Sequence, residues 1–210
     1  MNLADRFGSI YDLNMWGASK SRSGLGSEPA ATAAISAQIG DLVSRLNVQS
    51  ILDAPCGEGF LLENMPQKVA YHGVDIVAPL IKDLSERYSL SSNRDFSVSD
   101  ICSDPLPDAE LAVCRDLLVH LSFGNVLLVL RNLMSSGCSW LLVTHFTEVD
   151  QNYDVEDGDW RPLNMTLPPF NFPEPIELLN ERCHEANGTY ADKMLGLWHL
   201  PTLKERVDLE

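Results

Sequence analysis

One stretch, residues 48–60, constrains the fold of this chain more than any other. It runs from a short apolar segment into an acidic residue and then into a turn that contains Gly57 and Gly59, after which an apolar segment resumes. An apolar run that breaks into glycines and resumes as a helix is typical of a buried parallel strand that opens onto a ligand. Glycine suits such a turn because a side chain would block the approach of the backbone to the ligand. The stretch therefore predicts a ligand-binding turn, and the rest of the chain has to identify the ligand.

The composition predicts a single domain with a substantial core. The chain has 210 residues, of which 45% are hydrophobic and 21% charged, and both values are ordinary for a globular protein. No segment approaches the ~20 apolar residues of a membrane helix. The N-terminus, Met1 to Ser9, lacks the basic and apolar regions of a secretory signal. We therefore expect a cytoplasmic protein with no membrane partner.

The charge of the chain is strongly negative. There are 30 acidic residues against 15 basic ones, which gives a formal charge of −15 and repels a polyanion at long range. We therefore expect no nucleic-acid partner and favour a small-molecule substrate. The five cysteines show no paired metal spacing and the five histidines are scattered, so no metal site is predicted. The sequence carries no signal for an oligomeric state.

Strand and helix patterns alternate along the middle of the chain. Strands are predicted at residues 48–53, 69–77, 95–98, 111–115 and 139–146, and helices at 32–46, 60–65, 80–88 and 126–134. This alternation predicts a parallel sheet with crossover helices on both faces. Two late strands, 176–183 and 194–200, flank Asn187-Gly188, which is a signal for a tight turn. We therefore expect a seven-stranded, mostly parallel α/β sheet that ends in an antiparallel hairpin.

The N-terminal segment, residues 1–30, is predicted to be a lid. It combines aromatic residues with a loop of small hydroxyl residues and glycine, a composition that can order over a ligand and exclude water. Tyr11 and Trp16 would wall a pocket, and backbone amides and hydroxyls would hold a carboxylate. A packed helix followed by a flexible loop is the alternative interpretation. The hydrophilic candidates for ligand binding in this segment are Arg22, Ser23 and Ser27.

A second segment, residues 147–174, is predicted to be a substrate-side insertion in a domain that spans residues 31–210. It is rich in proline, and a long loop without regular structure is usually functional or disordered. Trp160 and Arg161 would wall and anchor a carboxylate-bearing acceptor, because arginine offers a bidentate fork, and Asn164 adds a further polar contact. The alternative is a buried Trp160 beside a surface Arg161.

Three successive predicted strands end in an acid, namely Asp53, Asp75 and Asp100. In an open α/β sheet, ligands bind beyond the carboxyl ends of the strands. Asp75 follows Asp53 by 22 residues, close to the ~20-residue spacing of an acid that binds ribose hydroxyls. Asp100 is placed to accept a hydrogen bond from an exocyclic amine. Acids are also common in the first turns of helices, but three at successive strand ends favour an adenosine-bearing ligand.

The motifs at these strand ends resemble those of class I S-adenosylmethionine-dependent methyltransferases over about residues 30–200. They read Ile51-Leu52-Asp53-Ala54-Pro55-Cys56-Gly57-Glu58-Gly59, then Gly73-Val74-Asp75-Ile76, then Ser99-Asp100-Ile101. Pro55 departs from the family pattern, because it stands where the first of three glycines is usual. The resemblance implies a Rossmann-like three-layer fold and S-adenosylmethionine as cofactor.

The resemblance also implies roles for individual residues. Asp75 would hold the ribose hydroxyls, and Ile76 would lie against the adenine face. Asp100 and Ile101 would meet the adenine edge. The methionine portion would be lined by Asp53, Cys56, Gly57 and Gly59, and the sulfonium and its methyl group would lie over Cys114, Arg115 and Asp116.

Arg115, Asp116 and His120 are the catalytic candidates. If this segment is helical, Asp116 and His120 face the same side because they are four residues apart. His120 would then take a proton from the acceptor, oriented by Asp116 or by a backbone group. A histidine that only packs against the cofactor is the alternative.

These observations predict methyl transfer from S-adenosylmethionine to an oxygen or nitrogen of a small molecule, such as a metabolite or a natural-product intermediate. Proximity and desolvation would drive the reaction. A same-fold enzyme that cyclises or cleaves the aminocarboxypropyl arm of S-adenosylmethionine, without a separate acceptor, is the alternative. A non-catalytic binding module is a third interpretation, which the retained acids and glycines disfavour.

Overall fold

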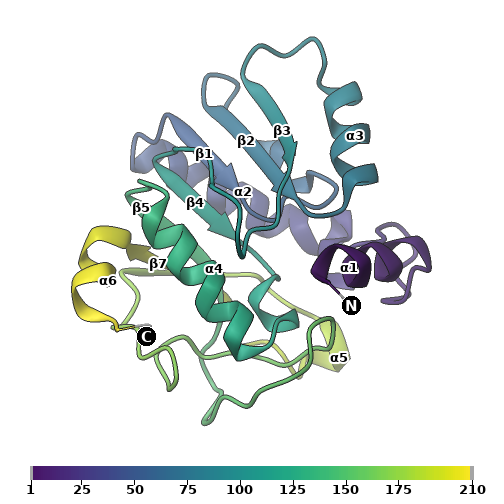
Figure 1. The fold of residues 1–210 in the computed structure, drawn as a ribbon. Coiled ribbons are helices and arrows are strands. Elements are labelled where there is room, and N and C mark those ends of the chain that lie inside the picture. Colours follow the sequence, from purple (N-terminus) through teal and green to yellow (C-terminus); the bar gives the residue numbers. More distant parts are fainter. Residues whose placement is uncertain (1, 209–210) are drawn as a thin grey trace.

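The computed structural model describes residues 2–208, so the outermost residues of the predicted ranges 1–30 and 31–210 lie outside it. A seven-stranded sheet forms its middle layer, in the order β3-β2-β1-β4-β5-β7-β6 (Figure 1). The first five strands pair in parallel, and β7 is antiparallel to both of its neighbours. The predicted fold class is therefore confirmed. The strands are β1 Ser50–Asp53, β2 Ala70–Asp75, β3 Arg94–Val98, β4 Leu111–Cys114, β5 Trp140–Phe146, β6 Glu177–Asn180 and β7 Lys193–His199.

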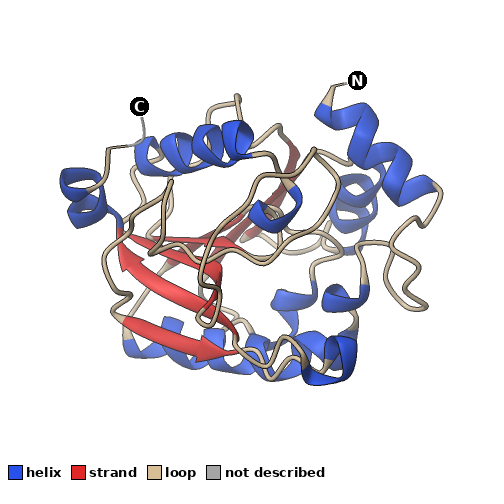
Figure 2. Cartoon of the chain, turned by 90° about the horizontal axis from the view of Figure 1, so that it is seen from below, coloured by secondary structure: helices blue, strands red, loops and turns tan. Residues whose placement is uncertain are grey.

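Helices cover both faces of this sheet, which gives the three layers visible in Figure 2. Because successive side chains of a strand point to opposite faces, Ile51 packs in one core and Leu52 in the other. The core that contains Ile51 is closed by α2 (Pro29–Arg45) and α3 (Ala78–Arg87). The core that contains Leu52 is closed by α4 (Phe123–Ser135) and α6 (Leu200–Arg206).

Two crossovers are simpler than the alternation predicted. Residues 60–65 form only a 3₁₀ turn, η2 (Phe60–Asn64), instead of an α-helix. The segment is too short to form an α-helix by itself, and Pro66 follows it directly. No regular element is present in residues 99–110, which connect β3 to β4. The helical layers are therefore thinnest beside the ends of the first three strands.

The late hairpin is present, but its connection is not a tight turn. Residues 181–192 join β6 to β7 and contain one irregular helical turn, α5 (Glu185–Gly188). Asn187 has a positive φ of 58° inside that turn. The predicted two-residue turn at Asn187-Gly188 is therefore wrong, because the strands end several residues away from it.

Two segments without strands pack around the carboxyl ends of the sheet. The N-terminal segment consists of α1 (Leu3–Asp12), a loop and a short 3₁₀ turn, η1 (Leu25–Ser27). Residues 147–174 contain no helix or strand, as predicted. The two segments touch where the Arg6 side chain donates a hydrogen bond to the Asp157 carbonyl at 2.9 Å. Within residues 2–208, no helix has both the length and the apolar character needed to cross a membrane.

Candidate active site

A cleft of about 1060 Å³ opens at the carboxyl ends of β1 to β4, where ligands bind in open α/β sheets. We call it the first cleft. The three strand-end acids Asp53, Asp75 and Asp100 all line it, together with Arg115 after β4. The structure therefore brings together the residues that the sequence placed at strand ends. Cys56, Gly57, Ile76 and Ile101 also line the first cleft.

Asp75 fixes the glycine turn. Its Oδ2 accepts a hydrogen bond from the Gly57 amide at 3.1 Å, and its Oδ1 accepts one from the Val77 amide at 2.9 Å. Gly57 has a φ of 50°, in the left-handed region that glycine adopts most easily. Burial raises the pKa of Asp75 to about 6. The carboxylate is thus held at the end of β2 with its remaining lone pairs available to a ligand.

Gly59 has a different reason to be glycine. It lies outside the lining of the first cleft, and a Cβ on it would meet Leu84 of α3 at 2.8 Å. Its φ is 78°. Gly59 therefore allows the chain to turn beneath α3, and the predicted direct contact with the cofactor is not what the structure shows.

Asp53 is buried with one oxygen unpaired. Its Oδ2 accepts a hydrogen bond from the Tyr71 hydroxyl at 2.5 Å, whereas Oδ1 has no partner among the described residues. Burial raises the pKa of Asp53 to about 7. Ser99 Oγ and Arg115 Nε are likewise buried without a partner in the described part of the chain, and both residues line the same cleft. Because buried polar atoms are normally hydrogen-bonded, these three unpaired atoms indicate a polar ligand in the first cleft.

The N-terminal segment contributes side chains to the lining of this cleft. Tyr11 and Trp16 line it, and the Arg22 guanidinium lies 5.5 Å from the centre of the Tyr11 ring. The Arg22 amide donates a hydrogen bond to Glu58 Oε1 at 3.0 Å, which ties the segment to the glycine turn. The remaining candidates of the segment, Ser23 and Ser27, line the cleft as well.

A second cleft of about 770 Å³ lies beside the first. The two clefts adjoin each other, because they share five lining residues: Trp16, Ser23, Ser27, Asp116 and His120. The second cleft is completed by residues from β5, the insertion and the late hairpin, namely Phe146, Trp160, Cys183, Glu185, Tyr190 and Lys193, and by residues 24–26. The site therefore has two compartments with His120 and Asp116 at their junction.

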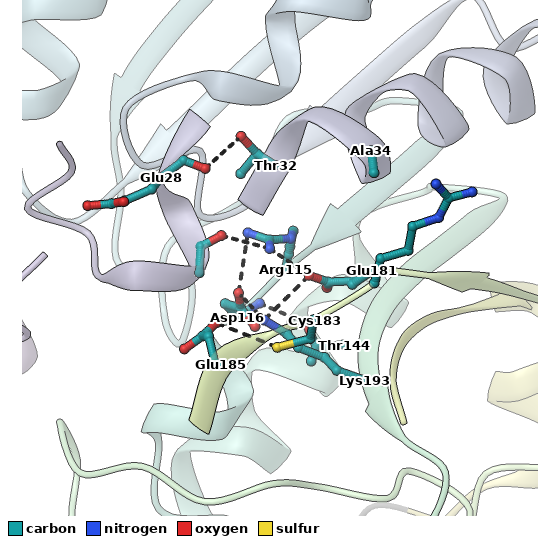
Figure 3. Close-up of polar contacts among 12 residues, drawn as sticks. Glu28, Thr32, Ala34, Arg115, Asp116, Thr144, Glu181, Cys183, Glu185 and Lys193 are labelled. Atoms are coloured by element: carbon teal, nitrogen blue, oxygen red, sulfur yellow. Dashed lines mark hydrogen bonds and ion pairs between the residues drawn. The ribbon is translucent and has the colours of Figure 1, made fainter. Parts of the chain in front are cut away.

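Four charged side chains form a buried cluster at this junction (Figure 3). Glu181 Oε2 lies 2.6 Å from Arg115 Nη2 and 3.4 Å from Lys193 Nζ. Asp116 Oδ2 lies 2.7 Å from Lys193 Nζ and 3.2 Å from Arg115 Nη1. Burial opposes ionisation of Asp116, but Lys193 and Arg115 outweigh it and hold the pKa of this carboxyl well below its usual range. We call these four residues the charge cluster.

The charge cluster also anchors the lid. Arg115 Nη2 donates a hydrogen bond to the Gly26 carbonyl at 2.9 Å. No local pattern pairs Glu181 and Lys193 with Arg115, because these residues come from distant parts of the chain. The one local signal is a lysine at the start of the otherwise apolar strand β7.

His120 is held by Trp16 and by a backbone carbonyl. Its ring stacks on Trp16, with 4.5 Å between centroids and 29° between planes. Nδ1 lies 2.8 Å from the Asp159 carbonyl oxygen, which can only accept, so Nδ1 carries the proton. Burial lowers the pKa of His120, and the ring is therefore neutral at pH 7. Nε2 has no hydrogen-bond partner among residues 2–208 and is the nitrogen that can accept a proton.

Asp116 does not orient His120, in contrast to one of the two predicted arrangements. Asp116 has a positive φ of 56°, which breaks any helix, and the 3₁₀ turn η3 begins only at Leu118. The Asp116 carboxylate instead faces Lys193. The orienting group is the Asp159 carbonyl, which is the backbone alternative.

Arg161 lies outside both clefts, which corrects its predicted role as a carboxylate anchor. It is fully buried, and its guanidinium donates hydrogen bonds to the carbonyls of Leu118 and Leu121 at 2.6 Å each. Arg161 therefore holds the turn that carries His120 and is a positioning residue.

Two other candidates also lie away from the clefts. Asn164 is buried within the insertion, where it accepts a hydrogen bond from Thr166 at 2.7 Å and donates one to the Val149 carbonyl at 3.1 Å. Cys114 is fully buried in the core below the site. Trp160 does line the second cleft and is 38% exposed. Of the three insertion residues proposed for the acceptor, Trp160 alone is placed to touch it.

The fold is shared with many solved structures, 598 chains in all. One is the N-methyltransferase NodS from Bradyrhizobium japonicum WM9 in complex with S-adenosylhomocysteine, with a TM-score of 0.52 and 14% identity over 67% of this chain and 74% of that one. Another is magnesium protoporphyrin IX methyltransferase (ChlM) from Synechocystis PCC 6803 with bound S-adenosylhomocysteine, with a TM-score of 0.50 and 14% identity over 70% of this chain and 68% of that one. The methyltransferase domain of bacterial CtHen1-C has a TM-score of 0.50 and 14% identity over 55% of this chain, which spans 66% of that domain.

No protein-family model and no curated protein sequence matches the chain. At 14% identity the likeness to solved structures shows the fold alone. The strand order, the antiparallel β7 and the flanking helices are those of the class I S-adenosylmethionine-dependent methyltransferase fold. The chain has this fold.

Proposed function

We propose that this protein transfers a methyl group from S-adenosylmethionine to an oxygen or nitrogen of a small-molecule acceptor. The observation that carries the proposal is that the two clefts adjoin each other at shared lining residues. One has the polar atoms that an adenosine-bearing cofactor needs, the other is open to an acceptor, and a neutral histidine stands between them. NodS and ChlM, which share the fold, hold S-adenosylhomocysteine.

The residues of the first cleft fit this cofactor. Asp75 would accept the two ribose hydroxyls, since a carboxylate offers lone pairs to both. The unpaired Oδ1 of Asp53 would accept a hydrogen bond from the α-ammonium group of the cofactor's methionine portion. The unpaired Nε of Arg115 would donate a hydrogen bond to the α-carboxylate of the same portion. Ile76 and Ile101 would pack on the adenine. When bound, the cofactor supplies a methyl group on a positively charged sulfur.

The remaining residues act on the acceptor. His120 Nε2 would accept the proton of the attacked group, and the Asp159 carbonyl would stabilise the imidazolium that forms, because it already accepts from Nδ1. The lid excludes water from the junction of the clefts, which strengthens these interactions. Asp116 takes no part in this proton transfer, because its carboxylate is held by Lys193 and Arg115 of the charge cluster.

The test of the proposed function separates it from cleavage of the cofactor. Protein incubated with S-adenosylmethionine alone is expected to form no thioether by-product above the spontaneous rate, and labelled methyl is expected to appear in an acceptor when one is supplied. By-product formed without an acceptor would instead identify an enzyme that cyclises or cleaves the aminocarboxypropyl arm. Absence of S-adenosylhomocysteine binding in calorimetry would leave only a non-catalytic module.

Asp75→Asn is expected to weaken binding of S-adenosylhomocysteine by about 100-fold, because charge-assisted hydrogen bonds contribute about 1.5–3 kcal/mol each. Asp75 now accepts hydrogen bonds from two backbone N–H groups. In the variant the amide nitrogen would face one of them, and that hydrogen bond would be lost. Calorimetry measures the affinity. Asp95→Asn, on the exposed side of the neighbouring strand β3, is the matched control and should bind normally. An Asp75→Asn affinity within threefold of the wild type would exclude the ribose role.

Cofactor binding is expected to release a proton near pH 6. The free Asp53 carboxyl, with a pKa raised to about 7 by burial, is mostly protonated at that pH. An ammonium group beside it favours the ionised form, so its pKa falls on binding and the affinity rises with pH up to about 7. Calorimetry in two buffers of different ionisation enthalpy measures the released proton. Asp53→Asn should reduce the buffer dependence and leave the part that Asp75, with a pKa raised to about 6, contributes, and a wild type without such dependence would contradict the contact.

A further inference from the structure

We propose that the second cleft binds a neutral, polyhydroxylated ring, a sugar or glycoside, and that one of its hydroxyls is the methyl acceptor. This inference rests on the proposed function and names the class of acceptor. Four features of the cleft carry it: the absence of an available cation, an unpaired carboxylate, an exposed aromatic surface, and a base placed to take a hydroxyl proton.

Among residues 2–208, the lining of the second cleft offers no unpaired lysine or arginine to an anionic acceptor. Lys193 is the one lysine or arginine in its lining, and its Nζ is bound to Asp116 at 2.7 Å and to Glu181 at 3.4 Å. Arg161, which the sequence suggested for a carboxylate, is turned toward the Leu118 and Leu121 carbonyls. An anion in this cleft would therefore lack a partner and would face acidic groups.

Hydrogen-bond acceptors, by contrast, are available. Glu185 Oε1 has only a long contact with Cys183 Sγ, at 3.8 Å, and no ion pair within the described residues. A Cβ built on Gly26 would lie 2.9 Å from Asp116 Oδ2 and 3.3 Å from Glu185 Oε1, so these oxygens converge beside the lid backbone (Figure 3). Carboxylates are the strongest acceptors for hydroxyl groups, and two of them can bind adjacent hydroxyls.

Aromatic rings also line the second cleft. Trp160 and Tyr190 are 4.8 Å apart between ring centroids, and both rings pack edge-on against Phe146. Trp160 keeps 38% of its surface exposed, which is a large apolar area for a residue in a cleft. The C–H groups on one face of a pyranose are apolar and slightly positive, so they pack well on the negative face of an aromatic ring.

A cationic amine is the competing ligand, since carboxylates and aromatic rings also attract cations. Two observations favour the hydroxyl. Lys193 Nζ, 3.4 Å from the same Cβ position beside Gly26, already pairs with Asp116, so Asp116 attracts an ammonium group less strongly than a free carboxylate would. His120 offers a neutral Nε2, which suits an alcohol because the hydroxyl proton must leave as the methyl group arrives.

The reaction on a sugar hydroxyl is balanced without a further reactant. A bond forms between the hydroxyl oxygen and the methyl carbon, and the bond between that carbon and the sulfonium breaks. The electron pair of the broken bond stays on sulfur, which becomes a neutral thioether. The hydroxyl proton passes to His120 Nε2 and is then released to water.

Binding to the protein saturated with S-adenosylhomocysteine tests the inference without requiring turnover. The probes are the methyl glycosides of glucose, galactose, mannose and rhamnose, with benzylamine and benzoate as cationic and anionic comparisons, each measured by ligand-observed saturation-transfer NMR. At least one glycoside is expected to bind in the millimolar range and more tightly than benzylamine and benzoate. Preference for benzylamine or benzoate, or binding of none of the four glycosides, would overturn the inference.

Two variants locate the bound glycoside. Trp160→Ala is expected to weaken it about tenfold through the lost stacking surface, and Glu185→Gln about fivefold through the weaker acceptor. The controls are Tyr153→Ala, an aromatic residue that is 54% exposed outside both clefts, and Glu205→Gln on α6. Equal affinity in all four variants would overturn the placement.

The outcome for S-adenosylhomocysteine keeps the two proposals distinguishable. If it binds and benzylamine is the preferred probe, the sugar inference fails and methyl transfer stands. If S-adenosylhomocysteine itself does not bind, both fail.

Discussion

His120→Ala is expected to lower kcat for methyl transfer by about 10²–10³-fold, the range for loss of a general base, while S-adenosylhomocysteine affinity stays within about threefold. Nε2 is the base that faces the junction of the clefts, and it takes no part in the buried hydrogen bonds that hold the fold. Turnover with the acceptor of the wild-type protein, together with calorimetry, measures the two effects. His72→Ala, on β2 and outside both clefts, is the matched control.

The pH profile gives this prediction a second readout. Burial lowers the pKa of His120 below its usual 6.5, so the neutral, proton-accepting form persists in more acidic solution than for a free histidine. Activity should therefore persist to lower pH than a free histidine would allow and fall as the pH drops through the lowered value. Near-unchanged turnover in His120→Ala would show that the ring only packs against Trp16.

Glu181→Gln is expected to destabilise the protein by about 3–5 kcal/mol, the usual cost of removing one partner of a buried ion pair. Glu181 is 4% exposed and contacts both Arg115 and Lys193, so the variant leaves two buried cations with Asp116 as their one acidic partner in the charge cluster. Urea denaturation followed by circular dichroism measures the loss.

A surface pair provides the control for Glu181. Glu177→Gln breaks the ion pair with Arg45. The Glu177 side chain is 34% exposed and the Arg45 side chain 55%, and exposed pairs contribute only about 0–1 kcal/mol to the free energy of unfolding. If Glu181→Gln cost no more than Glu177→Gln, the charge cluster would not be a buried ion-pair network. A double variant, Glu181→Leu with Lys193→Met, should recover part of the loss because it removes one acid and one base together.

Much of the fold was predictable because its strands are buried on both faces. Such strands are continuous apolar runs, and Ile51 and Leu111 belong to runs of this kind. The position of an acid at a strand end then follows from where the run stops, which is why Asp53, Asp75 and Asp100 were found together. These predictions need only local pattern and the rule that parallel strands end at one edge.

The remaining parts depend on contacts between distant residues. Nothing local to Glu181 shows that it meets Arg115, and the bidentate geometry of Arg161 does not show which carbonyls or carboxylates it will face. The Asn187-Gly188 signal lies in the connection between the two strands but not in a tight turn, since β6 ends at Asn180 and β7 begins only at Lys193. Directions of long polar side chains were therefore the main errors, and the positions of the strand-end acids were the main successes.

The charge cluster has a consequence for how the protein is made. Arg115 and Asp116 leave the ribosome long before Glu181 and Lys193, and the N-terminal segment that carries Gly26 leaves first of all. A nascent chain that stops at residue 175 has the three strand-end acids but lacks two of the four charges and the strand β7 that lies between β5 and β6. Its lid has been synthesised but has no complete surface on which to dock. The ability to bind a ligand between the clefts therefore appears only once β7 has been translated. Ribosome-bound chains of increasing length should acquire S-adenosylhomocysteine binding in one late step.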